Sequence, residues 1–161
     1  MEKKWTAKEL FKGIVEFENR IGQLYDNIAE DVKEQFGVFF ENMAKDEYRH
    51  AKIYEALGQR VEEEGLVIPE EDQVYLSTLF DNSSLKDPKI LEDAKKIKNK
   101  WQILDLAEKV EREAIGYVRE LAELFPDLAE DQVKVLLQEE KKHLQMVLDR
   151  KRDAQTQFLG L

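Results

Sequence analysis

The feature that most constrains this chain is a set of polar residues that repeats on otherwise apolar helical stripes. Each of its 2 histidines follows a glutamate by three positions, and a further inward glutamate precedes each of these two pairs. The partners, each 93 residues apart, are Glu18 and Glu111, Glu47 and Glu140, and His50 and His143. Such self-similarity at one offset predicts two copies of a single helical hairpin.

Apolar residues with the same offset surround these polar ones. The inward positions alternate in steps of four and three residues, the period of helices that pack in bundles. The matched apolar pairs include Phe11 and Leu104, Ile14 and Ala107, Phe40 and Val133, and Met43 and Leu136. Because the chain also has only 7 glycines and 3 prolines and many good helix formers, we expect an all-α protein.

The connections between the apolar runs predict how the helices are arranged. Thr6 to Glu9 and Asp127 to Glu130 have the spacing of capping boxes, which begin helices. A short break around 33–35 separates the first two runs, and turn signals between 65 and 100 indicate a long crossover with short helices around 70–80 and 88–98. Short connections force antiparallel neighbours. We therefore expect one domain over 1–161, a four-helix bundle with hairpins at 6–64 and 101–152.

Composition excludes several classes of function. The chain carries 35 acidic against 25 basic residues, a net charge of -10, which disfavours binding to nucleic acid. Without cysteine it has no disulfide, no Cys-ligated zinc and no iron–sulfur cluster, so any metal uses oxygen and nitrogen ligands. The charged N-terminus lacks a targeting pattern, and no apolar run approaches the roughly 20 residues of a membrane span. We expect a cytoplasmic protein without membrane contact.

Four inward carboxylates are costly to bury unless something compensates their charge. Two divalent cations would neutralise them, and a glutamate and histidine three residues apart lie on one helix face. A single Glu-x-x-His is most often a solvated helix surface or a satisfied histidine. Two of them, inward and at one shared offset, favour a metal site.

The same residues resemble a known pattern. One glutamate from each of two helices and a Glu-x-x-His from each of two others is similar to the ferritin-like di-iron carboxylate proteins. Within that group the chain most resembles the rubrerythrin family. The likeness lies in the segments Glu18–Tyr25, Asp46–Ala51, Glu111–Val118 and Glu139–His143.

The resemblance implies a ferritin-like four-helix bundle that holds two iron ions, with manganese or zinc as substitutes. It places Glu18 and His50 on one iron, and Glu111 and His143 on the other. It makes Glu47 and Glu140 the bridges between the two ions.

It also implies supporting residues around the ligands. Tyr25 matches a tyrosine that forms a hydrogen bond near the site, although an ordinary buried aromatic would fit the sequence as well. Asp46 and Glu139 each precede a bridging glutamate, where an acid orients the histidine of the opposite half; either could instead be a solvated charge.

Other acidic and aromatic residues in the chain are not expected to be principal metal ligands. Glu16 and Glu113 lie two positions from a ligand, on the far side of the helix, so we expect both to face solvent. Glu108 is a reserve ligand at best. Trp5 and Trp101, near helix starts, are expected to pack rather than to relay electrons.

The implied function is a non-haem di-iron oxidoreductase that reduces hydrogen peroxide or dioxygen. Because the chain has no cysteine for a rubredoxin-like domain, electrons would come from a separate donor protein. Ala114 stands where peroxidase rubrerythrins carry an additional glutamate, which weakens the case for peroxide reduction. An iron-handling protein that oxidises or carries Fe²⁺ is the alternative, and a structural or partner-binding bundle stabilised by metal is a second. The family also implies a homodimer.

Overall fold

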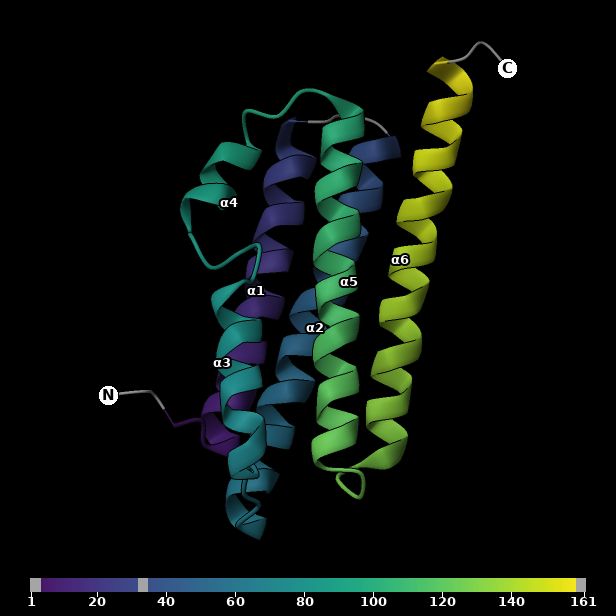
Figure 1. Ribbon diagram of the computed structural model, residues 1–161. Coiled ribbons are helices and arrows are strands. Elements are labelled where there is room, and N and C mark those ends of the chain that lie inside the picture. Colours follow the sequence, from purple (N-terminus) through teal and green to yellow (C-terminus); the bar gives the residue numbers. More distant parts are fainter. Residues whose placement is uncertain (1–3, 32–34, 159–161) are drawn as a thin grey trace.

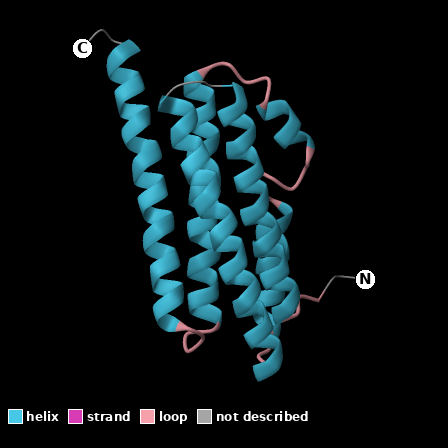
Figure 2. Ribbon diagram, turned by 180° about the vertical axis from the view of Figure 1, so that it is seen from behind, coloured by secondary structure: helices cyan, strands magenta, loops and turns pink. Residues whose placement is uncertain are grey.

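The computed structural model describes residues 4–31 and 35–158, and in this part of the chain every regular element is helical (Figures 1 and 2). The long helices are α1 (Ala7–Asp31), α2 (Gln35–Glu64), α5 (Lys100–Leu124) and α6 (Glu130–Phe158). Between the hairpins lie the 3-10 helix η1 (Glu70–Asp72), α3 (Gln73–Asp81) and α4 (Lys89–Ala94). The expected all-α fold is confirmed. The break expected at 33–35 overlaps residues 32–34, which lie outside the described residues.

The four long helices pair as two antiparallel hairpins. Helix α1 packs along α2 and α5 packs along α6, while η1, α3 and α4 run up the outer side of α1 (Figure 1). The crossover therefore returns the chain to the end of the bundle where α1 finishes. As a result α1 and α6 run in one direction along the bundle, and α2 and α5 run in the other (Figure 1).

The start of α1 and the end of α2 follow the local sequence, whereas the start of α6 does not. Thr6 Oγ1 accepts a hydrogen bond from the backbone N–H of Glu9, so the first capping box forms. Gly65, with φ of 65°, ends α2 in a Schellman turn in which the Leu66 N–H donates to the carbonyl of Val61. The capping box predicted at Asp127 to Glu130 does not start the helix, so this prediction is wrong. Ala129 has φ of 45° and lies outside the helix, and α6 begins at Glu130.

The crossover is anchored to both hairpins by side chains. Arg20 of α1 donates from Nη1 to the carbonyl of Leu85 at 2.7 Å, and Asn27 donates to the carbonyl of Leu91 at 2.9 Å. On α5, Glu113 Oε1 accepts from the backbone N–H and the hydroxyl of Ser84, both at 2.9 Å. Glu113 is therefore half-buried against the crossover, and the expectation that it faces solvent is wrong. Helix α4 ends at Ala94, short of the expected boundary near 98.

The apolar stripes meet in one core along the bundle axis. All eight matched apolar residues named from the sequence are buried, seven of them with at most 1% of their surface exposed. None of the helices in the described part of the chain combines the length and apolar character needed to cross a membrane.

Two glycines inside long helices should respond oppositely to a methyl group. At Gly58, a Cβ atom would lie 2.9 Å from Phe11 Cβ, which is fixed to the backbone of α1 and cannot move alone. At Gly116, a Cβ atom would meet nothing within 4 Å. We expect Gly58→Ala to lower the free energy of unfolding by about 1–3 kcal/mol and Gly116→Ala to raise it by about 0.5–1 kcal/mol, as measured by urea unfolding. Equal effects would contradict the close approach of α1 and α2.

Candidate metal centre

Six polar side chains meet at mid-height of the bundle. Helix α1 contributes one glutamate, α5 contributes another, and α2 and α6 each contribute a glutamate and a histidine one turn apart. Five of the six have no exposed surface and the sixth has 3%. They are Glu18, Glu111, Glu47, His50, Glu140 and His143.

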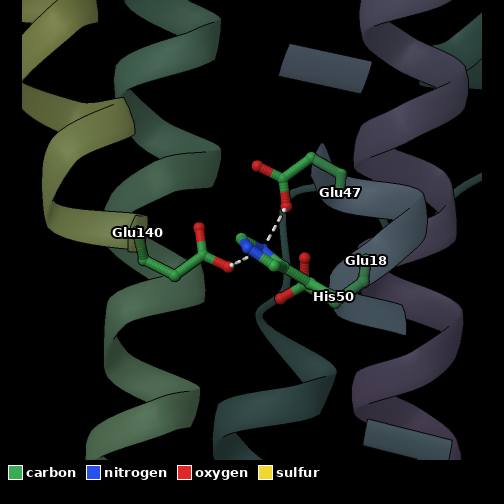
Figure 3. A group of neighbouring side chains, drawn as sticks. All are labelled: Glu18, Glu47, His50 and Glu140. Atoms are coloured by element: carbon green, nitrogen blue, oxygen red, sulfur yellow. Dashed lines mark hydrogen bonds and ion pairs between the residues drawn. The ribbon is translucent and has the colours of Figure 1, made fainter. Parts of the chain in front are cut away.

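These residues form two overlapping groups. In the first, one ligand atom from each of Glu18, Glu47, His50 and Glu140 lies within 4.8 Å of the others, and the four side chains point toward one another from three helices (Figure 3). In the second, Glu111 and His143 take the places of Glu18 and His50. Glu47 and Glu140 belong to both groups, so two ions at these positions would share two carboxylates.

The histidines cross from one hairpin to the other. His50 Nδ1 lies 2.8 Å from Glu140 Oε1, and His143 Nδ1 lies 2.7 Å from Glu47 Oε1. Both rings thus turn Nδ1 toward the centre. Each Nδ1 therefore contacts a carboxylate of the opposite hairpin, and the same nitrogen would be the ligand atom for a metal ion.

The outward nitrogen of each ring also has a partner. His50 Nε2 lies 2.6 Å from Glu139 Oε2, and His143 Nε2 lies 3.0 Å from Asp46 Oδ2. These are the cross-hairpin contacts that the resemblance implied for the two acids. Each contact fixes the ring and holds its proton on Nε2 when Nδ1 binds a cation.

Arg49 joins the two orienting acids, a role that sequence analysis missed. Its Nη2 donates to Glu139 Oε2 at 2.9 Å and to Asp46 Oδ1 at 3.4 Å. The position beside His50 was visible in the sequence, but the partner across the bundle was not.

Several carboxylate oxygens of the centre have no hydrogen-bond partner among the described residues. Both oxygens of Glu18 and one oxygen each of Glu47, Glu111 and Glu140 are buried and accept no hydrogen bond. Among these, Glu47 Oε2 lies 3.5 Å from His50 Nδ1 and Glu140 Oε2 lies 3.8 Å from His143 Nδ1. An unpaired buried anion costs several kcal/mol, and folded proteins almost always compensate it. These carboxylate oxygens, together with the two imidazole nitrogens, form a set of ligand atoms that suits divalent iron.

The pKa values of these groups are shifted by the same crowding of buried negative charge. Burial, followed by the charges of Glu140 and Glu47, raises the pKa of Glu18 well above its usual value, and burial with the same neighbours raises the pKa of Glu111. Burial opposes the cationic form of the histidines, but hydrogen bonds to the glutamates outweigh it. The pKa of His50 rises to about 11 and that of His143 to about 9. Without metal, protons therefore supply the positive charge that the carboxylates require.

Two buried tyrosines flank the centre differently. Tyr25 donates its hydroxyl to Glu111 Oε1 at 2.6 Å, a contact of the kind that the resemblance implied. Tyr54, one turn beyond His50 on α2, has a buried hydroxyl without a partner in the described part of the chain. Burial, followed by the charge of Glu18, raises its pKa well above its usual value.

The remaining candidates lie away from the centre. Glu16 is exposed on α1 as expected. Glu108 accepts hydrogen bonds from Lys151 and Arg112, both at 2.9 Å, which engage it at the bundle surface. Trp101 is 40% exposed, and Lys151 Nζ lies 4.9 Å from the centre of its ring.

Comparison with solved structures places this architecture in a known class. A crystal structure from Thermotoga maritima, described as a ferritin-like diiron-carboxylate protein, superposes with a TM-score of 0.69 and covers 96% of this chain and 99% of that chain. The two sequences are 20% identical, so the likeness establishes the ferritin-like fold.

The family follows from the sequence itself. The rubrerythrin family model matches residues 9–150, and the chain belongs to the rubrerythrin family. No curated protein sequence gives a significant match.

The raised histidine pKa values make the stability of the metal-free protein depend on pH. A histidine held as a cation by carboxylates stabilises the fold fully below its unfolded pKa of about 6.5, and this stabilisation is lost as pH rises through the folded values. Glu18 and Glu111, whose pKa values are also raised, likewise make the folded state less stable as pH rises. Urea unfolding of metal-free protein should therefore give a free energy of unfolding that falls from about pH 6.5 towards about pH 9, the pKa of His143 in the folded protein.

Metal-loaded protein provides the control for this trend. Ligands bind metal in their deprotonated forms, so the stabilisation that metal adds should grow over the same pH range. A metal-free protein whose stability stays level or rises would contradict the arrangement of buried charges.

The orienting acids should tune metal affinity. Glu139→Gln and Asp46→Asn each keep the side-chain shape but weaken the hold on a histidine ring, so we expect each to reduce Fe²⁺ affinity by about 10–100-fold. Competition with a chelator under anaerobic conditions measures this affinity. Glu16→Gln, an exposed change on α1, is the matched control and should leave affinity unchanged.

Proposed function

We propose that this chain binds two iron ions between its hairpins and uses them to reduce hydrogen peroxide or dioxygen. The observation that carries the proposal is the pair of buried four-residue groups that share Glu47 and Glu140. Membership of the rubrerythrin family supports iron as the metal. The unpaired carboxylate oxygens fit a cation at each group.

In this proposal each ion has its own glutamate and histidine. Glu18 and His50 would hold one ion, Glu111 and His143 would hold the other, and Glu47 and Glu140 would be the carboxylates shared by both. When bound in the ferrous state, the two ions would supply one electron each, which with two protons would convert hydrogen peroxide into two water molecules. The four carboxylates balance the charge of two divalent ions, so the ferrous state is neutral overall.

The protein's own groups hold the ions and direct protons. Glu139 and Asp46 keep both histidines in one tautomer, so that Nδ1 stays available to metal. Tyr25 keeps one oxygen of Glu111 engaged, which leaves the other free for an ion. The buried hydroxyl of Tyr54 has no competing partner in the described residues and can donate to a molecule bound on the Glu18 side.

The electron donor is a separate protein in this proposal, and the active form is a homodimer. The chain has no cysteine with which to hold an iron–sulfur or rubredoxin-type iron of its own. Two electrons per peroxide must therefore reach the centre from outside after each turnover.

Ala114 favours a second candidate function. It is fully buried one turn after Glu111, where it offers no additional carboxylate to an ion that changes its ligands. A centre with a fixed ligand set would also suit oxidation of Fe²⁺ as a substrate. Repeated turnover with an external reductant separates peroxide reduction from this iron-handling role.

The test is anaerobic loading with Fe²⁺, followed by iron analysis and addition of hydrogen peroxide with a supplied reductant. We expect two irons per chain, on the donor sets found here, and many peroxides consumed per centre. Glu18→Gln should lose most of this turnover while the circular dichroism of the helices is unchanged.

Glu16→Gln on the same helix is the control and should retain turnover. A single oxidation without further turnover would support iron handling instead. Binding of zinc alone, with no redox change, would support a bundle that uses metal only for stability.

A further inference from the structure

The two histidines of the centre are each joined to an accessible side chain by a hydrogen bond. His50 Nε2 lies 2.6 Å from Glu139, whose side chain is 32% exposed, and His143 Nε2 lies 3.0 Å from Asp46, whose side chain is 46% exposed. Arg49, itself 48% exposed, donates to both acids. A molecule that touches the two acids is therefore separated from each imidazole by a single side chain.

The other sides of the centre offer no such connection in the described part of the chain. The remaining hydrogen bonds and ion pairs of the six site residues join them to one another or to Tyr25, which is fully buried. The four glutamates of the centre have no exposed surface. The surface between α2 and α6 is therefore where hydrogen bonds connect the centre to solvent.

Exposed cations surround this connection. Arg49 and Lys142 are 93 residues apart, and each directly precedes one of the histidines. Lys45 and Lys52 lie one turn before and one turn after Arg49, on the same face of α2. The three lysines are exposed, and none of them forms a hydrogen bond or ion pair with another described residue. We call Lys45, Arg49, Lys52 and Lys142 the basic surface.

The basic surface has the opposite sign to the whole chain, whose net charge is -10. Its two nearest acids, Asp46 and Glu139, are already engaged by the histidines and Arg49, so the charges of the lysines are left uncompensated. Val135, one turn before Glu139 on α6, is 50% exposed and adds an apolar contact. Charge of one sign on a surface steers partners of the other sign towards it. The basic surface therefore suits a partner with an acidic face, which the rest of the chain would repel.

We propose that the basic surface is the docking site of the electron donor, an acidic protein that carries one electron at a time. The proposal rests on the proposed function, because that function consumes two electrons for each peroxide. In each encounter one electron leaves the redox group of the donor and one ferric ion becomes ferrous, with no bond made or broken. Glu139 and Asp46 connect the docked donor to the imidazoles through their hydrogen bonds.

Docking can be measured separately from turnover. The probe is an acidic plant-type ferredoxin in its oxidised form, and surface plasmon resonance gives its association rate with the unaltered protein at low ionic strength. We expect saturable binding that weakens steeply with added salt, because salt screens exposed charges. The triple variant Lys45→Glu, Lys52→Glu, Lys142→Glu should slow association by about tenfold or more. Absence of saturable binding to the unaltered protein would overturn the docking site.

A second triple variant separates local charge from total charge. Lys12→Glu, Lys96→Glu, Lys109→Glu makes the same change in net charge at exposed lysines of α1, the crossover and α5. It is the matched control and should leave the association rate nearly unchanged. Equal slowing in the two triple variants would overturn the docking site, because total charge alone would then explain the result.

A second copy of this acidic chain is the competing occupant of the basic surface. Analytical ultracentrifugation of the unaltered protein and of the first triple variant distinguishes the two. We expect the same oligomeric state and the same circular dichroism in both. Dissociation of the variant into smaller species would show that the surface joins copies of the chain, and would overturn the docking of a donor there.

Iron-loaded protein tests whether docking delivers electrons. Reduction of the oxidised centre by reduced ferredoxin should slow by about tenfold or more in the first triple variant. Reduction by the methyl viologen radical, a small cation, should not slow, which shows that the centre itself is intact. Unchanged reduction by ferredoxin would overturn the docking site while leaving peroxide reduction intact. Absence of bound iron in the unaltered protein would instead overturn the proposed function.

Discussion

The structure depends on the burial of four carboxylates between two helical hairpins. Such a cluster opposes folding unless positive charge reaches it, and the chain supplies only two imidazoles at that depth. Without metal, His50 and His143 hold protons far above their usual range and pair with glutamates of the opposite hairpin. Two divalent ions would replace those protons at the same nitrogen and oxygen atoms. Metal binding and docking of the hairpins are therefore coupled through the same contacts.

The cross-hairpin contacts explain why the acids beside the bridging glutamates matter to the whole bundle. Asp46 reaches the histidine of α6, Glu139 reaches the histidine of α2, and Arg49 donates to both acids. This cluster closes the metal centre on the side of α2 and α6 with charged groups that compensate one another. A ligand ring that rotated would break a contact to the other hairpin, so the geometry of the site is set by tertiary packing rather than by either helix alone.

Sequence predicted the centre better than its surroundings, for physical reasons. Glu18 and Glu111 could be found because a charged residue on an apolar stripe is conspicuous and because the repeat marked the same positions twice. Glu113 was misread because helix geometry places it opposite the ligands but does not reveal that Ser84 of the crossover covers that face. The start of α6 was misplaced because Ala129 adopts a left-handed conformation that its residue type does not signal. The unpartnered hydroxyl of Tyr54 depends on contacts between segments distant in sequence, which periodicity cannot supply.

The repeat makes the ligands nearly symmetric, whereas the rest of the chain makes the two halves of the centre different. On the Glu111 side, the nearby phenol of Tyr25 is already committed to a ligand oxygen. On the Glu18 side, both carboxylate oxygens and the phenol of Tyr54 lack hydrogen-bond partners among the described residues. The crossover packs against α1 and has no counterpart within the second hairpin. A symmetric pair of ions would thus lie in an asymmetric environment, in which the Glu18 side is better suited to receive a small oxidant.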